Sequence, residues 1–180
     1  MDILLRFSSL IDAASERIAR FAAWFGLVAV VVCTVNALFR YTLNMSSNAW
    51  LELQWYLNAV MFLLVAAYAL KKNIHVRIDV IAGKLPLRVQ AWIDILGGLF
   101  ALLPTSIIIA WYSWPSLVSS WEISEHSSDP GGLIRWPVRL LIPVAFTLLA
   151  LQGVAEVAKR IAFLAGAIPN PAVQRQEEAG

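Results

Sequence analysis

The chain has 180 residues, of which 59% are hydrophobic and 14% are charged, and its formal net charge is +2. A soluble domain carries about 25% charged residues, so this composition indicates an integral membrane protein. The small net charge gives no indication of nucleic-acid binding, and a single cysteine, Cys33, excludes an intrachain disulfide framework. Eight tryptophans suit a chain that meets two lipid–water interfaces.

Residues 1–19 have the pattern of an amphipathic helix. Apolar residues recur at helical spacing, with charged residues between them, at Ile3, Leu4, Phe7, Leu10, Ile11, Ala14 and Ile18. The segment is too short and too charged to span a bilayer, so we predict an interfacial helix that lies on the membrane surface. A cleaved signal peptide is the competing interpretation, but the following apolar run is long and lacks a persuasive small-x-small cleavage site.

Residues 20–160 form the predicted membrane domain. A hydrocarbon core of about 30 Å requires roughly 20 apolar residues in a helix. The uncharged runs therefore predict four transmembrane helices, over about 21–40, 49–70, 92–118 and 136–158. The third span contains Pro104 and Pro115, which favour a kink. The expected fold class is an all-α integral membrane protein, followed by a flexible cytoplasmic tail over residues 161–180.

The distribution of Lys and Arg predicts the orientation of the spans. With four spans, the two termini and the second loop share one side of the membrane and carry eleven of these residues, against three on the other side, Arg40, Arg135 and Arg139. The positive-inside rule then places both termini in the cytoplasm. The third loop, which contains Glu122, Glu125 and Asp129, is expected to face the periplasm.

The chain shows no pattern that indicates an enzyme, a cofactor or a metal site. His75 and His126 both lie outside the predicted spans, so an intramembrane haem would lack its usual axial histidine. The sequence has no Walker-type glycine-rich loop and no HExxH or CxxC spacing. We therefore expect no catalytic residues and no bound cofactor.

Glu52 is the most informative charge in the predicted spans, because an ionisable group in a membrane usually faces protein or water. One interpretation is a proton or cation relay. The other, which we favour, is a carboxylate paired with a partner or exposed at the interface, because the bundle offers no deeper titratable group. Asp94 and Glu156 are interpreted more simply as charges at helix ends.

Small residues suggest two faces where helices could approach closely. The first contains Ala22, Gly26, Ala29, Cys33 and Ala37, and the second contains Gly97, Ala101 and Thr105. Packing within the bundle and packing against another subunit both remain open. In the second loop, polar and apolar residues alternate through His75, Arg77 and Asp79. We interpret that loop as a structural corner, since these residues supply too few ligands for a metal.

At these positions the chain resembles a known family. The chain resembles the small membrane (DctQ-like) subunit of tripartite ATP-independent periplasmic (TRAP) transporters at Glu52, in the stretch 61–70 and in the HVRIDV box at 75–80. The stretch 127–137, with Gly131, Gly132, Arg135 and Trp136, resembles the branch labelled for mannitol or chloroaromatic compounds. Two features depart from many relatives. Leu51 and Leu53 flank Glu52, where an acidic pair is common, and Ile74 replaces a glycine.

The resemblance implies a multi-pass protein of the bacterial inner membrane. It would support a large membrane subunit in the ion-driven, usually sodium-driven, uptake of an organic acid that a periplasmic binding protein delivers. Partner-contact or structural roles are expected for Glu52, Trp55, His75, Arg77, Asp79, Gly131, Gly132, Arg135 and Trp136. Two alternatives remain: a small four-helix exporter that uses Glu52, and a membrane anchor of a respiratory enzyme.

Overall fold

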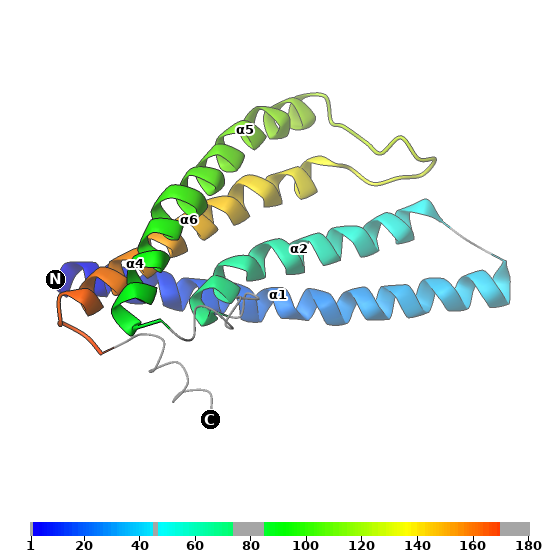
Figure 1. Ribbon diagram of the computed structural model, residues 1–180. Helices are drawn as coiled ribbons and strands as arrows, with labels where there is room; N and C mark the ends of the chain where they lie inside the picture. Colours follow the sequence, from blue (N-terminus) through cyan, green and yellow to red (C-terminus); the bar gives the residue numbers. More distant parts are fainter. Residues whose placement is uncertain (1, 45–46, 74–84, 170–180) are drawn as a thin grey trace. The chain divides into compact units, whose positions relative to one another are not determined.

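The computed structural model describes residues 2–44, 47–73 and 85–169, and the long elements of this part are all helices. They are α1 (Asp2–Leu43), α2 (Asn48–Lys72), α4 (Leu87–Gly97), the π-helical turn η1 (Gly98–Leu102), α5 (Leu103–Glu122) and α6 (Trp136–Leu164) (Figure 1). Within these described ranges, four stretches are long and apolar enough to cross a membrane: Leu4–Leu43, Asn48–Lys72, Leu87–Glu122 and Trp136–Leu164. The predicted all-α class with four spans is confirmed.

A separate amphipathic helix over residues 1–19 is not confirmed, because α1 continues without a break from Asp2 to Leu43 (Figure 1). The chain has no glycine or proline before Gly26 that would interrupt it. The polarity of the segment is also the reverse of the usual arrangement in a soluble helix. Ser8 and Ser15 are buried against protein, whereas Leu4 and Leu10 are exposed.

The third predicted span consists of three consecutive elements, α4, η1 and α5. Across η1, the Leu103 N–H donates to the Gly98 carbonyl, five residues earlier. Pro104 follows immediately and has no N–H to donate, and its ring crowds the carbonyl of the preceding turn. The local widening to a π-turn relieves this crowding. Helix α5 continues through Pro115, so the expected irregularity occurs beside Pro104.

The described helices belong to two compact units, and α1, α2, α5 and α6 each contribute a part to both. The network unit comprises Met1–Glu16, Ala66–Ile108 and Thr147–Gly180. The loop unit comprises Arg17–Val65 and Ile109–Phe146. Each unit brings together segments that are far apart in the sequence, and each contains one cluster of polar side chains.

Small residues allow close helix packing within each unit. In the loop unit, Ala29, Val32 and Leu57 form a buried cluster with Phe25 and Leu53 packed against it. A Cβ on Gly26 would lie 2.8 Å from the Met61 sulfur, so this glycine belongs to the internal contact between α1 and α2.

The network unit has equally close contacts of its own. A Cβ on Gly98 would lie 2.8 Å from a Val157 methyl, and one on Gly153 would lie 2.6 Å from a Leu102 methyl. A Cβ on Gly97, in contrast, would meet no atom within 4 Å. One of the two predicted small-residue faces is thus largely internal at Ala22, Gly26 and Ala29, whereas Gly97 lies on an open surface.

Candidate functional site

The loop between α5 and α6 folds back on itself as a short hairpin. The Ser127 N–H donates to the Leu133 carbonyl over 3.0 Å, and the Arg135 N–H donates to the Glu125 carbonyl over 2.8 Å. His126 and Ile134 form an antiparallel bridge between these two bonds. We call residues 123–135 the hairpin loop.

Two glycines permit the tight turn at the tip of the hairpin loop. Gly131 has a φ of +74°, a conformation that L-residues with a side chain rarely adopt. A Cβ on Gly132 would collide with the Cβ of Ser127 and would lie 3.0 Å from the Asp129 carbonyl oxygen. The Gly132 N–H donates to that same carbonyl over 3.0 Å. The backbone conformation at Gly131 and the close packing at Gly132 therefore explain why glycine occupies both positions.

Helix α2 holds the hairpin loop through three residues spaced four apart. The Glu52 carboxylate accepts a hydrogen bond from the Leu133 N–H over 2.6 Å. One turn earlier, the Asn48 amide donates to the Pro130 carbonyl over 3.2 Å, and one turn later, the Tyr56 hydroxyl donates to the Ile134 carbonyl over 3.2 Å. Residues i, i+4 and i+8 share one helix face, so the three contacts lie along a single line.

The Ser127 hydroxyl also donates to the Glu52 carboxylate. The carboxylate therefore contacts both strands of the hairpin loop. Glu52 therefore has a structural role in this geometry. It accepts hydrogen bonds from a backbone N–H and a hydroxyl of the hairpin loop.

Charged contacts attach the hairpin loop to the ends of the two helices that it connects, and an aromatic contact joins the two helix ends themselves. The Arg139 guanidinium lies 2.7 Å from the Glu125 carboxylate and also donates to the Ser116 hydroxyl and carbonyl. Arg135 lies 4.0 Å from Glu125. The rings of Trp121 and Trp136 pack edge to face, with centroids 4.5 Å apart.

The residues singled out from the sequence thus have different surroundings. Glu52, Gly131, Gly132 and Arg135 lie in or against the hairpin loop, and Trp136 begins α6 directly after it and packs on Trp121. Trp55 lies on α2 outside this cluster and is 74% exposed. His75, Arg77 and Asp79 lie outside the described residues.

Sequence reasoning missed other members of the site, among them Asn48, Tyr56 and Arg139. The four-residue spacing of Asn48, Glu52 and Tyr56 was the available signal for the first two. Their acceptors are backbone carbonyls about eighty residues away, and no side-chain pattern marks such an acceptor.

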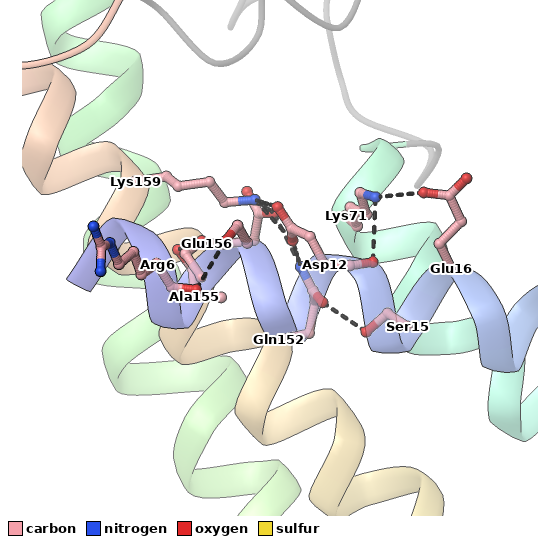
Figure 2. A network of polar contacts seen from close by, with 11 residues as sticks. Arg6, Asp12, Ser15, Glu16, Lys71, Gln152, Ala155, Glu156 and Lys159 are labelled. Atoms are coloured by element: carbon pink, nitrogen blue, oxygen red, sulfur yellow. Dashed lines mark hydrogen bonds and ion pairs between the residues drawn. The ribbon is translucent and has the colours of Figure 1, made fainter. Parts of the chain in front are cut away.

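The network unit contains a second polar cluster, centred on Gln152, which is fully buried (Figure 2). The Gln152 amide donates to Asp12 over 2.7 Å and to Glu156 over 3.3 Å, and its oxygen accepts from the Ser15 hydroxyl over 2.7 Å. The Lys159 ammonium lies 3.0 Å from Asp12 and 2.5 Å from Glu156. A single lysine therefore pairs with carboxylates from both α1 and α6.

Two further ion pairs belong to this unit. The Lys71 ammonium lies 3.0 Å from Glu16 and also donates to the Asp12 carbonyl over 3.2 Å (Figure 2). Arg160, whose side chain is 7% exposed, lies 3.0 Å from Asp94. Asp94 and Glu156, interpreted from the sequence as charges at helix ends, thus take part in contacts between and along helices.

Among the described residues, no three His, Cys, Asp or Glu side chains are grouped in a way that could hold a metal ion. Apart from the Gln152–Glu156 and Lys159–Glu156 contacts along α6, the side-chain hydrogen bonds described for the two clusters join helix to helix or helix to loop. Their geometry is suited to holding segments together.

A comparison with protein-family models matches residues 28–163 to the family described as tripartite ATP-independent periplasmic transporters, DctQ component. The chain belongs to this family. A search of curated proteins found no significant match. The match begins within the first span and includes the second and third spans, nearly all of the fourth, and the hairpin loop. It also includes the α6 residues of the Gln152 cluster.

Family membership decides several broader points. The DctQ component is a subunit of a transporter and not an enzyme family. A tripartite system contains further components, which in this family are a large membrane subunit and a periplasmic binding protein. Together with the four apolar helices, the match assigns the chain to the multi-pass proteins of the inner membrane.

Proposed function

We propose that this chain is the small permease subunit that supports the large membrane subunit of a TRAP transporter. The family match over residues 28–163 carries the proposal. The described structure adds a physical reason, because its polar side chains are used in joining helices and loops. In this proposal, the large subunit carries the transport path.

We further propose that both termini are cytoplasmic and that the hairpin loop faces the periplasm. The excess of Lys and Arg at the termini and in the second loop supports this orientation. The hairpin loop would then form part of the docking surface for the binding protein. A loop held by backbone hydrogen bonds and by α2 suits docking, because little conformational freedom remains to be lost on binding.

The expected cargo is an organic acid, and the expected driving force is an ion gradient, most simply sodium. Both follow from the resemblance to the family. The assignment to the mannitol or chloroaromatic branch rests on the stretch around Gly131 and Trp136 alone. The family match does not distinguish branches, and the cargo would be selected by the other subunits.

The alternative of a small exporter that uses Glu52 is less well supported. The Glu52 carboxylate is engaged by the Leu133 N–H and the Ser127 hydroxyl, an arrangement that suits a structural acceptor. The respiratory-anchor alternative requires a redox partner, which the family does not supply.

Co-purification tests the proposed function directly. We would express the tagged chain from its native operon, extract it in mild detergent and identify its partners by mass spectrometry. A large, very hydrophobic partner with about a dozen spans is expected. A homodimer that moves solute by itself in liposomes would overturn the proposal and make Glu52 the residue to study.

A matched pair of variants tests the proposed contact residues. Trp55 is exposed, so Trp55→Ala should weaken co-purification while leaving the thermal stability of the isolated subunit unchanged. Trp136 packs on Trp121 within the chain, so Trp136→Ala should lower that stability. Equal co-purification of the Trp55→Ala variant and the wild type would remove Trp55 from the proposed interface.

A further inference from the structure

The N-terminal part of α1, residues 2–16, which we call the arm, is attached to the network unit mainly through polar contacts. Ser8 donates to the Ala155 carbonyl, Asp12 pairs with Lys159, Ser15 donates to Gln152, and Glu16 pairs with Lys71 (Figure 2). These residues follow one another at helical spacing and form one face of the arm.

A second face of the arm, which adjoins the polar face at Leu4, is apolar and exposed among the described residues. Leu4, Phe7 and Leu10 are exposed, with Leu10 at 69%. Apolar side chains in this position are favourable only where acyl chains or protein cover them. In water, the same segment would turn its polar face outward.

The arm has to keep its polar contacts with the network unit and also keep its apolar side chains in lipid. The length of α1 makes these two requirements hard to meet together. Its 42 residues extend about 63 Å at 1.5 Å per residue, roughly twice the thickness of the hydrocarbon core. A straight α1 can keep the arm beside lipid only by tilting. A bend after the arm would instead let it lie flat, with Leu4, Phe7 and Leu10 in the membrane interface and its polar face in water.

We propose that the Asp12–Gln152–Glu156–Lys159 network is a latch. It holds the arm against α6 and so prevents the arm from lying flat on the membrane surface. Lys159 is the central part of the latch because it is 13% exposed and contacts a carboxylate on each side of the interface. Without its charge, Asp12 and Glu156 would lose the ammonium that bridges them. Other contacts of the arm include the ion pair of Glu16 with Lys71 and the hydrogen bonds of Ser8 and Ser15.

Cysteine reactivity measures the position of the arm. Ser8 and Ser15 are each 2% exposed, so a cysteine at either site is shielded while the latch is closed and reaches water when the arm leaves α6. We would introduce Ser8→Cys or Ser15→Cys into a Cys33→Ala background, reconstitute the full chain in liposomes and measure its rate of alkylation by N-ethylmaleimide. Ser120→Cys, fully buried in the loop unit, reports general unfolding.

The decisive comparison is between Lys159→Met and Lys159→Arg. The methionine keeps the length of the side chain and removes its charge, whereas the arginine keeps the charge. We expect Lys159→Met to raise alkylation at both arm positions about tenfold, the factor that a loss of about 1.4 kcal/mol in closure produces. Lys159→Arg should stay near the wild-type rate, and Ser120→Cys should stay protected throughout.

Three results would overturn the latch. Equal protection of the arm cysteines in Lys159→Met and the wild type would show that the network does not hold the arm. Fast alkylation in the unsubstituted background would show that the arm is not held at all. Alkylation of Ser120→Cys in parallel with the arm would show that Lys159 stabilises the whole chain and not the arm. As a matched control, Arg139→Met removes a cation from the loop unit and should leave arm alkylation unchanged.

Discussion

The two units use polar groups in different ways. In the network unit, side chains pair with side chains between helices, and Asp12 and Lys159 are 147 residues apart in sequence. In the loop unit, side chains of α2 bind backbone groups of one hairpin loop. A charge on a helix face needs a neutralising partner, whereas a loop has free N–H and C=O groups that need donors and acceptors. Loss of a charge should therefore disturb helix packing in one unit and loop conformation in the other.

The largest effect is expected at the most buried ion pair. Arg160→Met leaves Asp94 without the guanidinium that lies 3.0 Å away, and the two side chains are only 7% and 18% exposed. We expect a loss of about 3 kcal/mol in the free energy of unfolding, measured by thermal denaturation in detergent. The double variant Arg160→Met/Asp94→Asn should recover part of this loss, and no recovery would argue against direct pairing.

The next largest effect is expected in the loop unit and is steric in origin. Gly132→Ala places a Cβ against the Ser127 side chain and the Asp129 carbonyl, and should cost about 2 kcal/mol. Gly97→Ala is the matched control, because its Cβ meets no atom and alanine favours the helix more than glycine does. The same assay should show Gly97→Ala to be neutral or slightly stabilising. Equal losses in both variants would contradict the proposed collision.

A smaller and more local effect is expected at Glu52. Glu52→Ala removes the acceptor for Leu133 N–H, so the hairpin loop should be cleaved faster in limited proteolysis while the helices stay intact. Glu52→Gln keeps an acceptor oxygen and should lie between the alanine variant and the wild type. In the assembled transporter, we expect Glu52→Ala to weaken the complex more than it changes sodium dependence. Normal assembly with lost sodium dependence would support a coupling role.

The smallest effect is expected at the most exposed ion pair of the network unit. Glu16→Gln removes the charge opposite Lys71, but Glu16 is 42% exposed and Lys71 keeps its bond to the Asp12 carbonyl. We expect a loss of about 0.5 kcal/mol by the same denaturation assay. A loss as large as that of Arg160→Met would show that burial does not rank the ion pairs of this unit.

The four spans were predictable from the sequence because a charge in hydrocarbon costs free energy. Transmembrane segments therefore stand out as long uncharged runs. The helices extend beyond the predicted spans, since backbone hydrogen bonding continues past the charged residues that bound the uncharged runs. Helix α1 shows the limit of this reasoning. The pattern over residues 1–19 predicts an amphipathic helix, but it cannot tell whether water or protein covers the polar side chains.

For the candidate site, the sequence by itself singled out Glu52, the Gly-Gly pair, Arg135 and Trp136 as unusual residues. Only the tertiary structure decided what they contact. It joined Glu52 to the Leu133 N–H, 81 residues away, and joined Asp12 to Lys159 from opposite ends of the chain. Span positions depend on local hydrophobicity, which a sequence window contains. Polar pairing depends on which helix faces meet, and that is settled only when the segments pack together.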